Sequence, residues 1–400
     1  MEQLFTTFYR HLDNTDERFS RYLIPEIRWN NRLIGILGAR GCGKTTLLLQ
    51  YIKTTYGIRP ENVLYASLDN IWFSTHTLYD LANRFYLLGG KILFLDEVHK
   101  YANWSIEIKN IYDDFTDMKI VFTGSSILNI FKSSGDLSRR AIYYMLHGMS
   151  FREYLIFEGL LDKSFKAFTL NEILTNHVTI AQEMNRKIKP IPAFKDYLKN
   201  GYYPYYKEDK ESYHERVLQI FNTIIETDLP IVENIDIYSI GKIKKLFYIL
   251  SSLVPFTPNI SKLSAEIDVT RISLMNYLQY LNKAQAIMTL EKAANGMSKL
   301  VKPEKIFLQN TNYIYALNAE KADIGTIRET FFLNQLRVKH RVDYVPETDF
   351  KVDGTYYFEI GGKSKGEKQI STLPNAFLVL DNIETGFSNR IPLWLFGFLY

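Results

Sequence analysis

The segment GARGCGKTT, residues 38–46, places three glycines and a lysine–threonine pair between two apolar runs. Its spacing fits G-x-x-x-x-G-K-[ST], a pattern in which backbone N–H groups surround phosphate oxygens, the lysine adds a positive charge and the threonine hydroxyl ligates Mg²⁺. The pattern predicts a phosphate-binding loop (P-loop). We expect nucleotide contacts from Gly38, Ala39, Arg40, Gly41, Cys42, Gly43, Lys44, Thr45 and Thr46.

A second motif, KILFLDEVHK at residues 91–100, ends an apolar run in two acids. Asp96 would join Thr45 in holding Mg²⁺, and Glu97 would polarise the water that attacks the γ-phosphate. Open α/β sheets bind ligands beyond the carboxyl ends of their strands, where these acids fall. The alternative, a solvated strand end, fits less well because four apolar residues precede the acids.

A third apolar run, KIVFTGSS at residues 119–126, ends in hydroxyl groups. In a P-loop ATPase with an additional strand, such a strand lies between the two that carry the phosphate motifs, and its end presents a polar sensor. Thr123 and Ser125 are both candidates, and a turn capped by hydroxyls is an equal alternative. Downstream, Arg139 or Arg140 would act as an arginine finger, in cis or on a neighbouring subunit, or the pair would be solvated.

Strands and helices must position these side chains. RLIGIL before the loop predicts a buried strand, and TTLLLQYIKTT after it predicts a helix with an apolar stripe. Because a helix N-terminus carries partial positive charge, a helix starting near Lys44 would attract phosphate. The sequence therefore predicts an α/β nucleotide-binding core with a parallel sheet over residues 1–148.

Five motifs in this order, GARGCGKTTLLLQ, ILFLDEVHK, VFTGSS, DLSRRA and MSFREYL, resemble the archaeal-like AAA+ ATPases, and NGYYPYY at residues 200–206 resembles the lid region of that family. The resemblance implies ATP and Mg²⁺ as cofactors. It implies a helical lid over 149–237, a winged helix over 238–298 and an α+β restriction-endonuclease-like (PD-(D/E)xK) domain over 299–400. It places Arg140 at the arginine of the family, with Arg139 as the alternative.

The winged-helix segment has its own sequence signals. SKLSAEIDVTRISLMNYLQYLNKA predicts two helices around a turn at Asp268–Val269, with Leu274, Leu278 and Leu281 facing the core. IMTLEKAANGM predicts a strand and a wing. The second helix could enter a DNA major groove, and a protein-binding or spacer role is an even alternative because the outward face is only modestly basic.

In the last segment, KPEKIFLQNTNYIYALN predicts a hairpin and IPLWLFGFLY a buried strand. Glu329, Asp349 and Glu359 could converge with a lysine on a Mg²⁺ site for phosphodiester cleavage. Two residues after Glu359 the sequence has Gly361 instead of lysine, and the nearest lysine is Lys363. We therefore expect a degenerate nuclease fold that binds or regulates. The lysines of GGKSKGEKQ predict either a phosphate-backbone patch or a solvated loop.

Composition restricts the remaining function classes. Net charge is +4, which permits nucleic acid or acidic partners without requiring them. A single cysteine, Cys42, excludes a disulfide framework and fits a reducing compartment. No apolar run approaches about 20 residues, the length of a membrane span, and the first residues do not resemble a signal peptide. We expect a cytoplasmic protein that does not contact the membrane.

The expected function is an ATP-hydrolysing AAA+ protein that couples nucleotide state to movement of the winged helix and nuclease-like domain, with double-stranded DNA as a candidate partner. One alternative is a slow nucleotide switch with a protein partner. Another is an ATP-regulated, metal-dependent nuclease. The sequence leaves open whether the chain forms a homo-oligomer.

Overall fold

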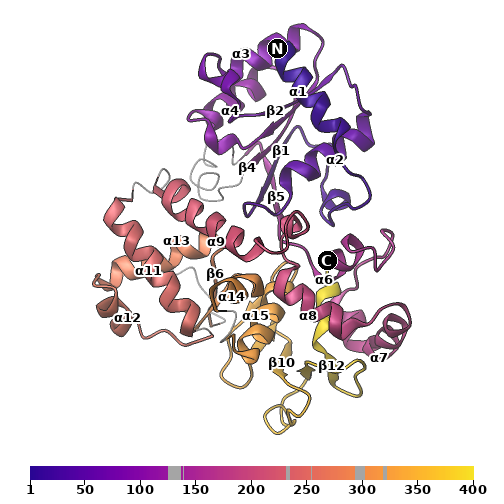
Figure 1. Cartoon of the computed structure of the whole chain (residues 1–400), viewed down its shortest axis with the longest axis vertical. Coiled ribbons are helices and arrows are strands. Elements are labelled where there is room, and N and C mark those ends of the chain that lie inside the picture. The colour runs from indigo at the N-terminus through magenta and orange to yellow at the C-terminus, as the bar shows by residue number, and fades with distance from the viewer. Residues whose placement is uncertain (125–136, 138, 231–234, 254, 293–301, 319–321) are drawn as a thin grey trace. The chain divides into compact units, whose positions relative to one another are not determined.

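The computed structural model describes residues 1–400 except 125–136, 138, 231–234, 254, 293–301 and 319–321 (Figure 1). The chain divides into two compact units, Met1–Gly148 and Met149–Tyr400. The first unit covers the residues predicted for the nucleotide-binding core. The second contains those predicted for the lid, the winged helix and the C-terminal domain, whose separate boundaries stay predictions.

A five-stranded parallel sheet forms the centre of the first unit, in the order β2-β3-β4-β1-β5. Its strands are β1 (Leu33–Gly38), β2 (Val63–Ser67), β3 (Ile92–Asp96), β4 (Lys119–Gly124) and β5 (Ile142–Leu146). Every residue of β1 is buried, as expected for a central parallel strand covered on both faces. Strand β4 lies between β1 and β3, so the predicted additional strand is confirmed.

Helices cover both faces of this sheet. Helices α1 (Glu2–Asp13) and α2 (Lys44–Tyr56) pack together on one face, and α3 (Leu78–Leu87) and α4 (Trp104–Asp114) pack together on the other (Figure 1). A capping box of Thr77 and Asp80 starts α3. The described residues of this unit also form the 3-10 helices η1 (Ile24–Glu26), η2 (Ile71–Ser74) and η3 (Val98–Lys100).

The second unit begins with helices and ends with a mixed sheet. Its α-helices are α6 (Phe151–Phe157), α7 (Leu170–Lys187), α8 (Pro190–Asn200), α9 (Tyr213–Thr223), α11 (Ile237–Leu253), α12 (Ile260–Glu266), α13 (Arg271–Lys283), α14 (Thr311–Asn318) and α15 (Ile324–Leu336). The shorter helices are η4 (Pro204–Lys207), the π-helix η5 (Ile224–Asp228) and η6 (Leu393–Phe398). No helix among the described residues combines the length and apolar character that crossing a membrane requires.

Helices α12 and α13 flank the predicted turn, where Asp268 has a φ of 53°. Leu274, Leu278 and Leu281 are buried, which confirms the predicted core face of α13. Strand β6 (Ile287–Leu290) follows and pairs antiparallel with β7 (Lys305–Leu308). The residues between them include 293–301, so the predicted wing lies outside the described residues.

The hairpin predicted over residues 302–318 is wrong, because β7 pairs with β6 and the chain then enters α14. The side chain of Asn310 accepts a hydrogen bond from the backbone N–H of Tyr313 at 3.2 Å. An asparagine in this position caps a helix start. The polar residues that suggested a turn thus begin a helix.

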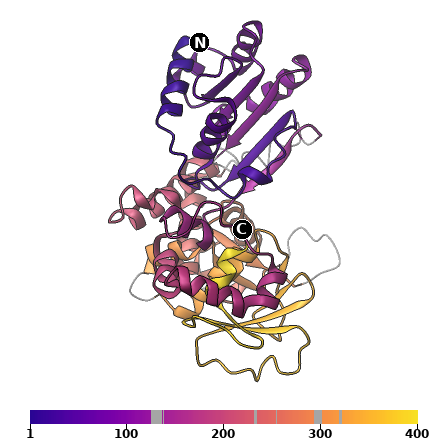
Figure 2. The same cartoon turned by 90° about the vertical axis from the view of Figure 1, so that its right-hand side faces the viewer.

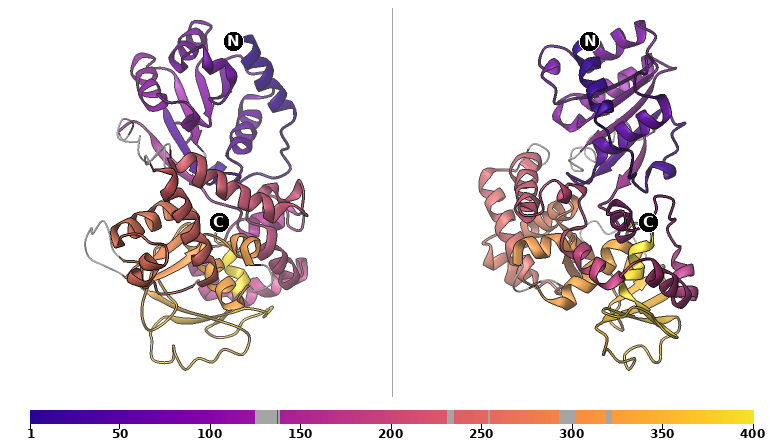
Figure 3. Two further views of the ribbon diagram at one scale, coloured as in Figure 1. Left: turned by 60° about the vertical axis from the view of Figure 1, so that its left-hand side comes forward. Right: turned by 45° about the vertical axis from the view of Figure 1, so that its right-hand side comes forward.

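The second sheet has the order β12-β11-β10-β9-β8, and its strands lie together in gold and yellow in Figures 2 and 3. The strands are β8 (Val342–Asp343), β9 (Phe350–Val352), β10 (Tyr356–Gly361), β11 (Ala376–Leu380) and β12 (Arg390–Pro392). Pairing is antiparallel from β8 to β10 and parallel from β10 to β12. Helix α15 packs against β10, and α7 packs against β12.

The long C-terminal strand predicted from IPLWLFGFLY is also wrong. Strand β12 ends at Pro392, and Leu393–Phe398 form the buried 3-10 helix η6. Proline has no N–H to extend a sheet, and the apolar residues after it bury themselves among α6, α7 and α15. The backbone carbonyl of Tyr400 accepts hydrogen bonds from Ser150 Oγ at 2.8 Å and Arg152 Nε at 2.9 Å.

Candidate nucleotide-binding site

The loop between β1 and α2 needs its glycines for different reasons. A Cβ at Gly38 would lie 2.3 Å from the carbonyl oxygen of Leu146 on the neighbouring strand β5, so no side chain fits there. Gly41 and Gly43 have φ values of 82° and 95°, in the left-handed region that favours glycine. Cys42 is fully buried and anchors the loop to the core. The glycine pattern therefore reflects the folded shape of the loop.

Lys44 is buried inside this loop. Its Nζ donates hydrogen bonds to the carbonyl oxygens of Gly38 at 3.0 Å and Ala39 at 2.9 Å. The ammonium is held by neutral acceptors of the loop itself. A phosphate oxygen is a stronger, charged acceptor, so the loop keeps a cation ready for an anionic ligand. Of the other predicted loop contacts, Thr46 is exposed on the first turn of α2.

Asp96 lies at the end of β3, and its carboxylate is the centre of a buried hydrogen-bond network. Its Oδ2 accepts from Thr45 Oγ1 at 2.6 Å and from the Tyr65 hydroxyl at 2.8 Å. Its Oδ1 accepts from Thr123 Oγ1 and from the backbone N–H of Glu97. Four donors compensate the loss of water around a carboxylate that is 2% exposed. The network joins α2, β2, β3 and β4.

Glu97 follows with a φ of 52° and a ψ of 37°, a left-handed conformation that is uncommon outside glycine. Its carboxylate Oε2 lies 3.5 Å from His99 Nε2, on an imidazole that is 1% exposed. Burial, followed by the positive charges of Lys100, Lys44 and Arg40, lowers the pKa of His99 to about 3. His99 is therefore neutral near pH 7 and adds no positive charge beside Glu97.

Two residues of this site carry no motif and were missed from the sequence. Tyr65 on β2 donates to Asp96, and burial together with the charge of Asp96 raises its pKa above the usual range, so the hydroxyl stays a donor. Arg21 is buried and donates from Nη1 to the carbonyl of Cys42 and from Nη2 to that of His147 at 2.7 Å. The one signal in the sequence that could have indicated Arg21 is its position directly before the apolar run YLI.

The sensor and finger candidates have different outcomes. Thr123 contacts Asp96 directly, whereas Ser125 lies outside the described residues. Arg140 forms a bidentate ion pair with Asp113 of α4, with two N–O distances of 2.9 Å. Arg139 is exposed. A finger role for either arginine stays a prediction.

The acids predicted for a second site in the C-terminal segment do lie together. Lys305 Nζ of β7 lies 3.3 Å from Glu329 Oε2 and 3.4 Å from Asp349 Oδ1. Asp349 Oδ2 accepts from the backbone N–H of Ile360, next to Glu359. Burial, and then the charge of Asp349, raise the pKa of Glu329 to about 7. Within the described ranges, however, no three His, Cys, Asp or Glu side chains are grouped to hold a metal ion.

The lysine that pairs with Glu359 is Lys365, and the expected Lys363 does not contact Glu359. Lys365 Nζ lies 2.5 Å from Glu359 Oε1, while Glu359 Oε2 is buried without a hydrogen-bond partner among the described residues. The chain bends after β10, where Lys365 N–H donates to the Gly362 carbonyl. The bend lays Lys365 over Gly361, whose Cβ would lie 2.5 Å from the Lys365 Cβ. The turn at the two glycines therefore brings Lys365 to Glu359, so that Lys365 takes the place of the lysine missing from position 361.

Comparison with known proteins adds to this geometry. Residues 30–155 match the AAA domain family, and residues 191–323 match a domain of unknown function (DUF8612). A curated relative, the uncharacterized protein MJ1637 of Methanocaldococcus jannaschii, is 29% identical over 305 residues, or 74% of this chain. The matched region spans 63% of the length of that relative, less than two thirds.

Solved structures resemble the chain more distantly. The Walker-type ATPase PABY2304 of Pyrococcus abyssi has a TM-score of 0.44 and 14% identity, covering 78% of this chain and 94% of that one. Cdc6p of Pyrobaculum aerophilum has a TM-score of 0.27 and 14% identity, covering 82% and 93%. The family match and the parallel sheet with its phosphate-loop geometry together identify an AAA-type P-loop ATPase domain in the first unit.

Proposed function

We propose that the first unit binds ATP with Mg²⁺ and hydrolyses it. The observation that carries this proposal is the contact between Thr45 of the phosphate loop and Asp96 of β3, at 2.6 Å, with Glu97 immediately after Asp96. It brings two hard oxygen ligands of the kind Mg²⁺ prefers to the start of α2. A carboxylate that can activate water stands next to them.

Thr45 and Asp96 would hold the Mg²⁺, which when bound neutralises charge on the phosphate oxygens. Lys44 would exchange its two loop carbonyls for phosphate oxygens, a gain because charged acceptors form stronger hydrogen bonds. Glu97 would orient the attacking water and accept its proton. Thr123, bonded to Asp96, would sense the occupied site, and Arg140 or Arg139 would complete it in cis or in trans.

Hydrolysis would then move the second unit, in which we place a helical lid, a winged helix and a nuclease-like domain. The order of α11, α12 and α13 followed by the β6–β7 pair supports the winged helix. Double-stranded DNA as partner, a homo-oligomer and a cytoplasmic location belong to the same proposal. The nuclease alternative has weaker support, because Lys305 and Lys365 engage the acids that a metal would need.

A slow nucleotide switch with a protein partner is the second candidate function. It is favoured by the bidentate ion pair between Arg140 and Asp113. A fast ATPase needs an arginine at the γ-phosphate, and the guanidinium of Arg140 is here bound to Asp113 instead. In a switch, nucleotide binding would change the shape of the chain, and turnover would be slow.

The test is ATP turnover and ATP binding by wild type, Lys44→Ala and Glu97→Gln, each with and without double-stranded DNA. We expect Lys44→Ala to lose ATP binding. Glu97→Gln should bind ATP and turn over about 10²–10⁴-fold more slowly, the usual contribution of a general base. Normal turnover in Glu97→Gln would overturn its role. Stimulation by DNA favours the DNA-coupled ATPase, and slow turnover indifferent to DNA favours the switch.

A further inference from the structure

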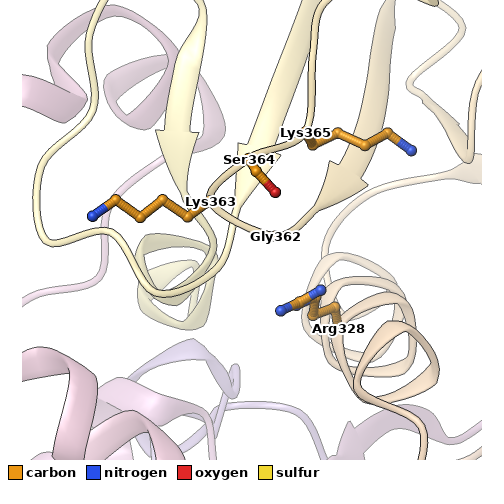
Figure 4. Close-up of a pocket in the computed structure, with 5 residues that line it drawn as sticks. All are labelled: Arg328, Gly362, Lys363, Ser364 and Lys365. Carbon is orange, nitrogen blue, oxygen red and sulfur yellow. The ribbon is translucent and has the colours of Figure 1, made fainter.

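A basic pocket opens on the second unit, beside the acid cluster of Glu329, Asp349 and Glu359. Its volume is about 720 Å³, and it is lined by Arg328, Gly362, Lys363, Ser364 and Lys365. Figure 4 shows Arg328 on helix α15 facing the bend that follows β10, with Gly362 between them. The Ser364 hydroxyl lies between the two lysines, which extend to opposite sides. Every ionisable side chain of the lining is cationic.

Arg328 is held in place from behind. Its Nε donates to Asp381 Oδ2 at 2.9 Å, and the two side chains are 18% and 13% exposed. This bond fixes the plane of the guanidinium. In the part of the chain that the structure describes, the two terminal nitrogens have no hydrogen-bond partner. They form the rigid fork that suits the oxygens of an anion.

Gly362 keeps the approach to this fork open. A Cβ at this position would lie 3.2 Å from Arg328 Nη1 and 3.3 Å from Nη2, against the face of the guanidinium. The φ of Gly362 is not positive, so the backbone itself does not demand glycine. The absence of a side chain at Gly362 therefore leaves room beside the Arg328 guanidinium.

The cations that line the pocket differ in whether a carboxylate pairs with them. Asp381 pairs with Arg328 and Glu359 pairs with Lys365, whereas Lys363 is exposed and has no ion-pair partner among the described residues. Of the three cations that line the pocket, two are therefore paired with a carboxylate and Lys363 is not. Burial opposes the charge of Lys365, but the carboxylates of Glu359, Asp349 and Glu329 together outweigh it and raise the lysine pKa, so this cation persists at neutral pH.

We propose that this pocket binds a phosphate group. The terminal nitrogens of Arg328 would take two of its oxygens, and the Lys363 ammonium and Ser364 hydroxyl would take others from the opposite wall. Donors on two walls suit a tetrahedral phosphate better than a planar carboxylate. The volume falls within the range of about 300–1,000 Å³ typical of ligand sites. The phosphate belongs either to a small ligand or to a nucleic-acid backbone.

The site is independent of the phosphate loop, so the test uses the full chain carrying Lys44→Ala, which removes that competing site. Two probes are used: radiolabelled inorganic phosphate in equilibrium dialysis, and a short fluorescent DNA duplex in anisotropy titrations over a range of salt concentrations. Three further substitutions are compared. Lys363→Ala removes the unpaired cation, Gly362→Val fills the approach to Arg328 without changing charge, and Lys368→Ala is the control, an exposed lysine of the same loop outside the pocket.

Lys363→Ala should weaken binding about tenfold, the effect of losing one charge-assisted contact, and for the duplex it should reduce the salt slope by about 1. Gly362→Val should weaken binding of the same probe at least as much, and Lys368→Ala by less than about twofold. Binding of phosphate alone assigns a small ligand; binding of the duplex as well assigns a nucleic-acid backbone.

Absence of saturable binding with both probes would overturn the proposal. Equal losses in Lys363→Ala and Lys368→Ala, with none in Gly362→Val, would overturn it too, because they indicate diffuse attraction by surface charge. Circular dichroism of each variant establishes that the second unit is folded.

Discussion

Replacing Tyr65 with phenylalanine tests how much the buried network around Asp96 contributes to the stability of the first unit. The substitution removes one hydroxyl and keeps the ring, so packing against neighbouring side chains is unchanged. Asp96 retains three of its four donors, from Thr45, Thr123 and the backbone of Glu97. The loss is therefore that of one hydrogen bond to a buried, charged acceptor.

Such a bond contributes about 1.5–3 kcal/mol. We expect the lower part of that range, about 1.5–2 kcal/mol, because the remaining donors can adjust around the carboxylate. This corresponds to a decrease of about 10–30-fold in the folding equilibrium constant of the first unit. ATP binding should persist, because Tyr65 does not belong to the phosphate loop.

The assay is urea denaturation of the full chain, with the unfolding of the first unit followed separately from that of the second. The matched control is Tyr79→Phe, which removes the same hydroxyl–carboxylate bond where it is exposed, to Asp114 at 2.8 Å. The control should leave the midpoint unchanged, since water replaces the lost bond. Equal, small shifts in both variants would refute the argument that burial makes the bond to Asp96 strong.

The remaining predictions concern His99 and two glycines. Because the folded-state pKa of His99 is lowered to about 3, the unfolded chain takes up its proton first, near its unperturbed pKa of about 6.5. The free energy of unfolding should therefore fall as pH drops from about 6.5 towards 3, by up to about 1.4 kcal/mol per pH unit for this group. In His99→Gln the free energy of unfolding should depend less steeply on pH, and a slope equal to that of the wild type would contradict this prediction. In turnover assays His99→Leu should lower kcat about tenfold with KM unchanged, because Glu97 is no longer held in position. The His99→Gln variant should retain a higher kcat than His99→Leu. A change in KM alone would argue against a positioning role. Gly38→Ala should destabilise the first unit by more than about 2 kcal/mol in denaturation, since its Cβ would meet the Leu146 carbonyl at 2.3 Å. Gly366→Ala, with open space around it, should be neutral.

The nucleotide-binding core could be predicted because each of its signals is local in sequence. A glycine loop lies between a buried strand and a helix, and two acids end another buried strand, so short segments suffice to place Lys44 and Thr45 at the start of α2 and Asp96 and Glu97 at the end of β3. Tyr65 and Arg21 could not be found this way. Their partners are brought near by the pairing of β2 with β3 and by the end of β5, neither of which leaves a pattern around the residue itself.

The C-terminal segment was harder for the same physical reason. Its acids were predicted to converge, but the lysine that pairs with Glu359 depends on a chain reversal at Gly361 and Gly362, which adjacent residues do not encode. Asn310 resembled a turn residue, because asparagine favours both turns and helix caps. Whether Asn310 forms a turn or a helix cap depends on the pairing of β7 with β6. These two strands are neighbours in space but are separated along the chain.

The hydrogen bonds that Ser150 and Arg152 donate to Tyr400 have a consequence for the order of folding. They join positions 250 and 248 residues apart. Contacts of such separation form slowly, because a long loop must close before they contribute. Because the first unit is compact over Met1–Gly148, we expect it to fold while synthesis continues. Helix α6, in contrast, gains its last partners only when Tyr400 has emerged. Chaperone demand during biosynthesis should therefore concentrate on the second unit.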